Sequence, residues 1–291
     1  MGVPRRYCIS SMDFVYSMYR FLTAFFMIDA ENKQNVSDAQ NVVLEDDKKE
    51  EQLPEEGALF VEGESVDQEV VLEMAKAGVL YGHRKFRKNP HFEEYVFTTR
   101  NSVEVIDLVK TLSAIDVVAE FLKKSKAEEK KFLVVATQPA ARQAAQKISA
   151  ALGDCPYVAE KWVGGTLTNF PIISKRINEF KRLKQGMETK SFDKYTKKEK
   201  LEISREIERM EKKFGSVQNI EGIPDIMLVV DSSIKGHRTA MREARRKGMK
   251  LIGIIDNDDN PKDFDYFIPA NDHAQASVEW VINRVIEVMS K

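Results

Sequence analysis

Three short apolar runs constrain the fold of this chain more than any other feature of its sequence. They are residues 132–137 (FLVVAT), 226–231 (IMLVVD) and 251–256 (LIGIID). Strands that are apolar on both faces are typical of parallel sheets covered by helices on each side. Helical patterns follow the first two runs, over about 139–152 and 237–247. This alternation predicts a doubly wound α/β/α sandwich around a parallel sheet.

The predicted sandwich domain spans residues 65–169 and 215–291. Ser65 and Gln68 offer a capping box to its first helix, and a Gly-, Asn- and Pro-containing loop follows over residues 78–92. The remaining patterns predict a hairpin of strands 95–98 and 103–106, a helix over 109–122, a strand over 266–269 and a last helix over 273–289.

Residues 170–214 interrupt the alternation with two helical patterns in succession. Their apolar residues recur at helical spacing, as Ile173, Ile177, Phe180 and Met187 and then as Ile203, Ile207, Met210 and Phe214. Thr196 and Glu199 supply a capping box for the second helix, so the chain turns near residues 191–195. We predict an antiparallel helical hairpin inserted into the sandwich. Two ordinary cover helices are the alternative.

The formal net charge of -1 hides an uneven distribution along the chain. Residues 29–69 carry 14 Asp and Glu against 3 Lys and Arg, whereas residues 70–291 carry 39 basic and 31 acidic side chains. We expect residues 1–64 to form an acidic, mostly disordered extension, because so polar a segment cannot bury enough apolar surface to offset its ordering entropy. The basic excess of the remainder favours a polyanionic partner, with nucleic acid as the first to consider.

The first residues imitate a secretory signal, because a basic pair precedes the apolar run 21–28. That run is much shorter than the roughly 20 apolar residues of a membrane span. Our hypothesis is that translation starts at Met27, so that residues 1–26 precede the true start. Cys8 and Cys155 lie far apart and in no C-x-x-C pattern, which fits a reduced cytoplasmic protein without a structural metal.

The loop over residues 78–92 concentrates residue types that contact RNA. Arg and Lys neutralise phosphates, while Asn, His and aromatic side chains hydrogen-bond to unpaired bases or stack on them. Clustered cations also repel one another unless a polyanion neutralises them. The RNA-binding candidates of this loop are His83, Arg84, Lys85, Arg87, Lys88 and Asn89. A solvated loop whose aromatic side chains pack inward is the alternative.

A second candidate site is the motif KWVGGTLTNF at residues 161–170. Its glycine pair permits a backbone turn or a close approach that a Cβ atom would block, and Thr168 or Asn169 can cap the helix that follows. The RNA-binding candidates here are Trp162, Gly164, Gly165, Thr168 and Asn169. The alternative is a simple connection between two elements.

Cations on the two predicted hairpin helices form a third candidate surface, because such side chains can follow phosphates along a groove. The candidates are Lys175, Arg176, Lys197 and Lys198, to which the β-hairpin adds Arg100 and Asn101. Interspersed glutamates, such as Glu208 four residues before Lys212, leave helix solubility as the alternative.

Acidic residues gather at the ends of two predicted parallel strands. They are Asp231, Asp256, Asp258 and Asp259, with His237 nearby. This edge binds ligands in doubly wound folds, and clustered carboxylates can hold a hard metal or act as acid and base. Asp and Asn also form turns, however, and no P-loop or complete G-x-G-x-x-G follows a strand. We predict no catalytic residue, metal or cofactor, and keep an enzyme that binds a phosphosugar or nucleotide as the alternative.

Seven motifs of the chain match one family in order over about residues 67–289. They are AGVLYGH with Asn89-Pro90, RNSVEVIDLVKT, KWVGGTLTNF, SFDKYTKKE, GIPDIMLVVD, EARRKGMKLIGIIDNDDNP and IPANDHA. Together they resemble the second protein of the small ribosomal subunit in its bacterial or organellar branch. The resemblance implies a flavodoxin-like sandwich with a protruding coiled-coil hairpin, and a structural protein of the ribosome rather than an enzyme.

The resemblance further implies binding to ribosomal RNA, contact with the multi-OB-fold mRNA-capturing protein, support of assembly and translation, and a cytoplasmic location in the ribosome. Departures from the family pattern weaken this inference at particular positions. Leu80 replaces a histidine, Gln138-Pro139 replaces a basic pair, and Ala270 and His273 alter the terminal motif. A module in which the helical hairpin grips a partner protein is a third alternative.

Overall fold

The computed structural model describes residues 68–291 apart from positions 190, 193, 216, 219 and 221. The predicted acidic extension over 1–64, the start at Met27 and the capping role of Ser65 lie outside the described residues. Within the described residues, no helix is both long enough and apolar enough to cross a bilayer.

A parallel sheet of five strands forms the centre of the fold, as the apolar runs predicted. Its strands are β4 (Phe132–Val135), β5 (Tyr157–Val158), β6 (Ile226–Val230), β7 (Lys250–Ile255) and β8 (Tyr266–Pro269). They lie in the order β5-β4-β6-β7-β8, which is the flavodoxin-like winding with its switch point between the first and third strands of the sheet. The register aligns Val134, Leu228, Ile252 and Tyr266 across four strands.

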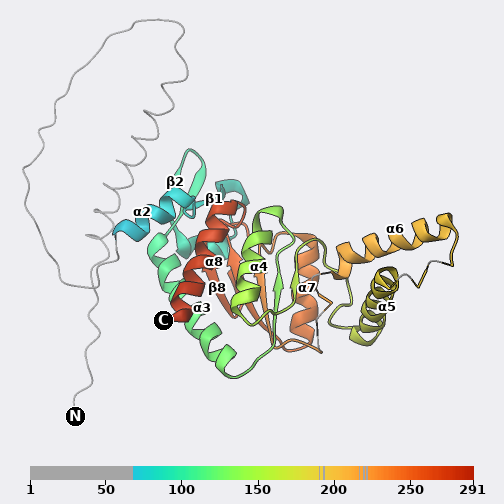
Figure 1. The fold of residues 1–291 in the computed structure, drawn as a ribbon. Helices are drawn as coiled ribbons and strands as arrows, with labels where there is room; N and C mark the ends of the chain where they lie inside the picture. The colour runs from blue at the N-terminus through green and yellow to red at the C-terminus, as the bar shows by residue number, and fades with distance from the viewer. Residues whose placement is uncertain (1–67, 190, 193, 216, 219, 221) are drawn as a thin grey trace, which may run out of the picture. The chain divides into compact units, whose positions relative to one another are not determined.

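Helices cover both faces of this sheet (Figure 1). They are α3 (Leu108–Ala127), α4 (Arg142–Ala151) and α8 (Gln275–Ser290), which contact one another, and α7 (Lys235–Arg246). Alternate strand residues such as Leu133 and Met227 pack against Ala240 and Ala244 of α7. Because successive strand side chains point to opposite faces, the intervening apolar residues serve the other layer. The predicted α/β/α sandwich is confirmed.

A smaller antiparallel sheet precedes the sandwich. Helix α2 (Gln68–Ala77) leads into β1 (Tyr81–Arg84), and β2 (Val96–Arg100) and β3 (Val103–Ile106) form the predicted hairpin, in the sheet order β1-β3-β2. Asn101 and Ser102 both have positive φ, 49° and 65°, as a two-residue turn of the right twist requires. The expectation of a loop over 78–92 was wrong, because this stretch contains β1 and the 3-10 helices η1 (Lys85–Arg87) and η2 (Pro90–Tyr95).

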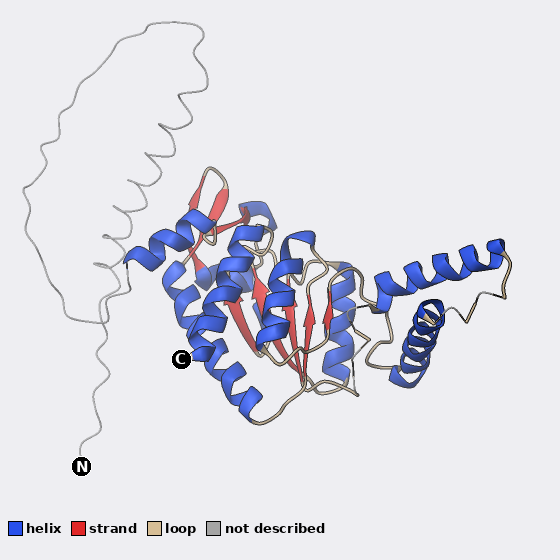
Figure 2. Cartoon of the chain, viewed as in Figure 1, coloured by secondary structure: helices blue, strands red, loops and turns tan. Residues whose placement is uncertain are grey.

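Two helices follow each other without an intervening strand (Figure 2). They are α5 (Phe170–Glu188) and α6 (Lys197–Phe214), and the predicted capping box of Thr196 and Glu199 is present. Their apolar stripes are buried only in part: Phe180 and Met210 join the sandwich core, but Met187 is 40% exposed.

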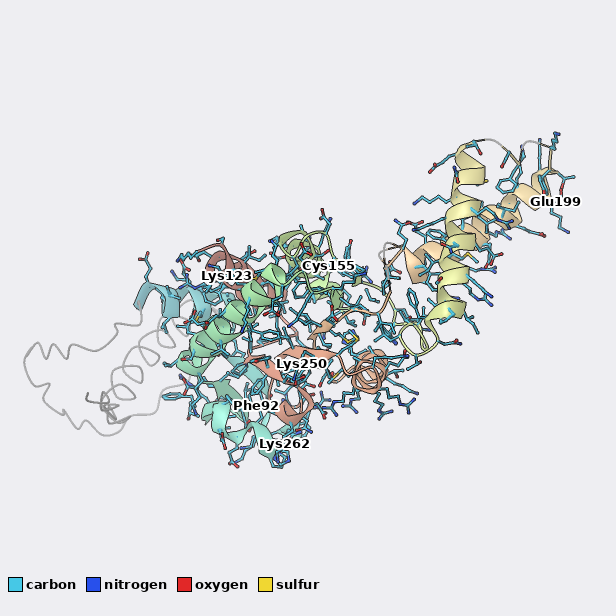
Figure 3. The ribbon with its side chains drawn as sticks, turned by 90° about the horizontal axis from the view of Figure 1, so that it is seen from below. Phe92, Lys123, Cys155, Glu199, Lys250 and Lys262 are labelled. Carbon is cyan, nitrogen blue, oxygen red and sulfur yellow. The ribbon has the colours of Figure 1, made fainter. Side chains whose placement is uncertain are left out.

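One ion pair between the two helices joins residues near the end of each. Lys184 Nζ lies 3.4 Å from Glu211 Oε2, whereas an aligned antiparallel hairpin with this short connection would place the beginning of α6 beside Lys184. Glu199 lies at the end of α6 that is remote from Cys155 and Lys250 of the sandwich (Figure 3). The coiled coil stays a prediction.

Candidate nucleic-acid interface

The segment after β1 presents three cations around one aromatic ring. Arg84, Lys85 and Arg87 are exposed, and none of them forms an ion pair with another described residue. Phe86 between them is 77% exposed, and the guanidinium carbon of Arg87 lies 6.0 Å from the centre of its ring. The ring is therefore not part of the core, and it is accessible from solvent together with the three cations.

Backbone and amide hydrogen bonds hold this segment in place. Lys85 N donates to Ser102 O (2.9 Å), and Asn89 N donates to Asn257 O (2.7 Å). The Asn257 side chain accepts from His83 N and donates to His83 O (3.1 Å). A Cβ atom on Gly82 would lie 2.8 Å from that side chain. The segment is therefore fixed to the end of β7, and a glycine is needed where the two approach.

Three of the predicted RNA-binding residues turn inward instead. Lys88 Nζ lies 3.2 Å from Glu93 and 3.4 Å from Glu104, whose side chain is fully buried. Asn89 Oδ1 accepts from His91 N (3.0 Å) at the start of η2. His83 Nδ1 pairs with Asp256 Oδ2. These residues shape the segment, and the surface that a partner can reach is residues 84–87.

The β-hairpin turn lies beside this surface. Val103 is paired with Arg84 on one side and with Arg100 on the other. Arg100 and Asn101 are exposed, so the small sheet brings two of the separately predicted sites together at one end. We call this group, residues 84–87 with Arg100 and Asn101, the cationic loop cluster.

The Gly-Gly motif is organised around one buried carboxylate. Glu243 of α7 accepts hydrogen bonds from Gly165 N (2.7 Å) and Leu167 N (3.1 Å). It also accepts from Trp162 Nε1 (3.3 Å), and from both the backbone N–H and the hydroxyl of Thr168 (each 3.3 Å). Burial alone would raise the pKa of Glu243, but these donors outweigh burial and lower that pKa. The carboxylate therefore stays charged and fixes the loop against α7.

This network accounts for most predicted residues of the motif. Gly165 has φ +92°, which favours glycine, whereas a Cβ on the exposed Gly164 would meet nothing. Trp162 is 5% exposed and belongs to the core. The expected side-chain cap by Asn169 or Thr168 was wrong: Asn169 makes no such hydrogen bond, and the Thr168 hydroxyl donates to Glu243. Sequence reasoning missed Glu243, which is the one acidic residue of α7.

The remaining candidates lie on α5 and α6. Lys175, Arg176, Lys197 and Lys198 are all exposed. They sit on other elements than the cationic loop cluster, so the predicted residues form separate surfaces rather than one site.

The strand ends bring acidic side chains together, as their positions predicted. Asp231, Asp256 and Asp259 are buried, and so is Asp272, which follows β8 and was missed. Among the described residues, three groups of side chains could each hold a metal ion, because the possible ligand atoms within each group lie within 4.8 Å of one another. The groups are His83, Asp256 and His273; Asp231, Asp272 and His273; and Asp256, Asp259 and Asp272. Burial raises the pKa of Asp259 to about 7. Burial, and then the neighbouring carboxylates, raise the pKa of Asp272 well above its ordinary value.

The switch point between β4 and β6 is filled by the protein's own side chains. Gln138 Nε2 donates to Asp231 Oδ2 (2.5 Å), and Thr137 N donates to His237 Nε2 (3.1 Å). Nε2 therefore accepts, and His237 Nδ1 donates to Asp231 O (2.5 Å). Burial lowers the pKa of His237, which favours this neutral form. These hydrogen bonds occupy polar groups at the point where a doubly wound fold usually binds a nucleotide.

Comparison with known proteins gives a consistent result. The family model described as ribosomal protein S2 matches residues 74–291. The protein named small ribosomal subunit protein uS2 from Parabacteroides distasonis is 39% identical over 219 residues, covering 75% of this chain and 78% of that protein. The uS2 protein of Bifidobacterium animalis subsp. lactis is 38% identical over 224 residues, covering 75% and 72%. That of Petrotoga mobilis is 35% identical over 217 residues, covering 75% and 74%.

Proposed function

The chain belongs to the ribosomal protein S2 family, and from that premise we propose that the cationic loop cluster binds RNA of the small ribosomal subunit. As a member of this family, the protein is a structural constituent of the ribosome and not an enzyme. The single observation that carries the proposal is that Arg84, Lys85 and Arg87, which form no ion pair with the described residues, surround the exposed Phe86.

The chemistry of the cluster suits RNA. Arg84, Lys85 and Arg87 can neutralise phosphates, and an exposed ring between them can stack on an unpaired base, as aromatic side chains do in RNA-binding proteins. The segment is already ordered by Asn257 and the backbone bonds of Lys85 and Asn89. Little backbone freedom is therefore lost on binding, and less of the interaction energy is needed to order the loop.

The other surfaces complete the proposed role. The sandwich over 65–169 and 215–291 acts as the RNA-bound body, and the helices over 170–214 act as a hairpin arm toward neighbouring proteins, including the multi-OB-fold mRNA-binding protein of the subunit. Exposed apolar side chains on this arm support a protein contact: Ile172 is 53% exposed and Leu201 is 51% exposed. Both roles place the protein in the cytoplasm, within the ribosome.

Combined replacement of Arg84, Lys85 and Arg87 by glutamine tests the RNA contact. The matched control replaces Lys76, Lys123 and Lys124, which are exposed on α2 and α3 and carry the same total charge. Tagged chains are followed into small subunits on sucrose gradients, and binding to purified small-subunit RNA is titrated at several salt concentrations.

Each lost phosphate contact reduces the slope of log affinity against log salt by about 0.7 for single-stranded RNA. In the loop variant, we expect the slope of log affinity against log salt to be smaller by about 2 and incorporation into subunits to be poor. The control should behave like the wild type. Normal incorporation and an unchanged slope for the loop variant would remove the cluster from the RNA interface.

A further inference from the structure

The outer face of α7 carries cations and no acidic side chain. Its exposed charged residues are Lys235, Arg238, Arg242, Arg245 and Arg246. Lys235, Arg238, Arg242 and Arg246 follow one another at steps of three or four, so they form one stripe along the helix. The opposite face is buried and includes Ala240, Met241 and Ala244. The one acid of the helix, Glu243, points inward to the Gly-Gly loop.

This pattern differs from an ordinary solvated helix of the same chain. On α6, Glu206 pairs with Arg209 and Glu208 pairs with Lys212. On α7 the neighbours at helical spacing have like charge, which destabilises a helix. Lys235 also lies in the first turn, where the positive end of the helix dipole disfavours a cation. The stripe therefore costs stability in the free protein.

Local partners leave much of this charge uncompensated. Arg245 pairs with Asp263 at 2.9 Å, and Arg238 Nε donates to Ser232 O at 3.2 Å. Lys235, Arg242 and Arg246 form no ion pair within the part of the chain that the structure describes. An external anion would relieve both the mutual repulsion of these side chains and the unfavourable position of Lys235.

We propose that the outer face of α7 binds the sugar-phosphate backbone of folded RNA, as a second contact in addition to the cationic loop cluster. The twelve residues from Lys235 to Arg246 span about 16 Å from the first Cα atom to the last, at 1.5 Å per residue, so the stripe can face several successive phosphates. Arginine guanidinium groups match phosphate oxygens in pairs. The stripe has no exposed aromatic residue, so we expect phosphate contacts without base recognition. The inference rests on the proposed RNA-binding function.

The fold also makes the stripe rigid. The hydrogen bonds of Glu243 fix α7 to the Gly-Gly loop, and Ala240, Met241 and Ala244 are packed in the core. Phosphate-binding side chains mounted on such a helix keep a constant spacing. Such a row of cations matches the regular spacing of phosphates in an RNA helix better than it matches the irregular spacing of carboxylates in a flexible acidic peptide.

The test is a full-length variant in which Lys235, Arg242 and Arg246 are replaced together by glutamine. These three residues have no local ion pair to lose, so we expect the melting temperature to stay equal or to rise. Binding to purified small-subunit RNA should show a salt slope smaller by about 3, from three contacts at about 0.9 each for a duplex backbone. Replacement of Lys76, Lys123 and Lys124 serves again as the control of equal charge.

The outcomes separate this inference from the proposed function. An unchanged slope in the α7 variant, with a reduced slope in the loop variant, would reject the stripe and leave the cationic loop cluster intact. Unchanged slopes in both variants would reject both RNA contacts. A labelled peptide of residues 29–69 that binds the wild type but not the α7 variant, with RNA binding unaltered, would assign the face to an acidic protein segment and overturn the inference.

Discussion

Replacing Glu243 by glutamine tests how the Gly-Gly loop is held against α7. The carboxylate is 5% exposed and accepts five hydrogen bonds, all from one short loop. Local hydrogen bonds from Thr166 to Val163 O and from Asn169 N to Gly165 O shape the loop but do not attach it to α7, and Asn169 makes no side-chain cap. We therefore expect the position of the loop to depend on this single side chain.

The expected loss follows from the geometry. A glutamine whose oxygen occupies the Oε1 position still accepts from Gly165 N, at 2.7 Å in the wild type. Its amide group then faces the backbone N–H groups of Leu167 and Thr168, at 3.1 and 3.3 Å, and cannot accept from them. Each hydrogen bond to a charged group contributes roughly 1.5–3 kcal/mol. Losing two of them should lower the free energy of unfolding by about 3 kcal/mol.

Urea unfolding of the full chain at pH 7 measures this loss, followed by far-UV circular dichroism and tryptophan fluorescence. Glu208→Gln is the matched control, because Glu208 is exposed on α6 and pairs with Lys212 at the surface. Surface ion pairs of this kind contribute little, so the control should change the free energy of unfolding by less than about 0.5 kcal/mol.

The loss should also depend on pH with a defined sign. Burial works to raise the pKa of Glu243, but the donors of the loop lower it below its ordinary value of 4.5. A carboxylate with a lowered folded-state pKa stabilises the fold above its unfolded pKa, and this contribution disappears as the pH falls through the folded value. The difference in the free energy of unfolding between the wild type and Glu243→Gln should therefore become smaller in acid. A loss below about 1 kcal/mol at pH 7, or a gap that persists in acid, would refute the reasoning.

Three further substitutions test other contacts. Lys88→Met should lower the free energy of unfolding by about 3 kcal/mol in urea titrations, because the buried carboxylate of Glu104 loses its cation; a loss no larger than that of Arg84→Met would contradict this. Phe86→Ala should leave the urea midpoint unchanged, since the ring is 77% exposed. It should weaken binding to single-stranded small-subunit RNA by about 1–3 kcal/mol in fluorescence titrations. Equal affinities of the variant and the wild type would exclude stacking. Asp259→Asn should stabilise the chain more at pH 8 than at pH 5. Burial raises the pKa of Asp259 from its ordinary value of 3.8 to about 7, so the wild type loses stability as the pH rises between these two values, where the carboxyl is ionised in the unfolded chain and still protonated in the fold; an effect of equal size at both pH values would count against it.

The central sheet could be predicted because its signal is local. Continuous apolar runs such as 132–137 and 226–231 mark strands buried on both faces, and every such run became a strand. Two strands without such a run were missed. β5 (Tyr157–Val158) is only two residues long, and β1 (Tyr81–Arg84) exists because it pairs with β3. Pairing with a distant partner overrides a composition that is typical of loops.

The sequence predicted the residue types of the candidate site but not which of their side chains are exposed and which are buried. A cluster of cations near residue 85 signals a polyanion, yet nothing local shows that Lys88 turns toward the buried Glu104 while Arg87 faces solvent. The hydrogen bonds of Asn257 to His83 depend on the meeting of two distant segments, which no local pattern shows. Glu243 did leave a signal: a lone acid next to the apolar positions of a strongly basic helix is expected to have a buried partner.

The direction of the side chains after β1 explains how a cationic surface coexists with the acidic strand ends. His83 pairs with Asp256, and Asn89 N donates a hydrogen bond to Asn257 O. These contacts attach the segment to the sheet edge that holds the buried carboxylates. A phosphate at that edge would meet buried negative charge and a switch point already filled by Gln138. This edge is therefore unfavourable for an anionic ligand at the position where a doubly wound fold usually binds one. Arg84, Lys85, Phe86 and Arg87 of the same segment are exposed, so the segment that is bonded to this edge also carries the cations of the proposed RNA contact.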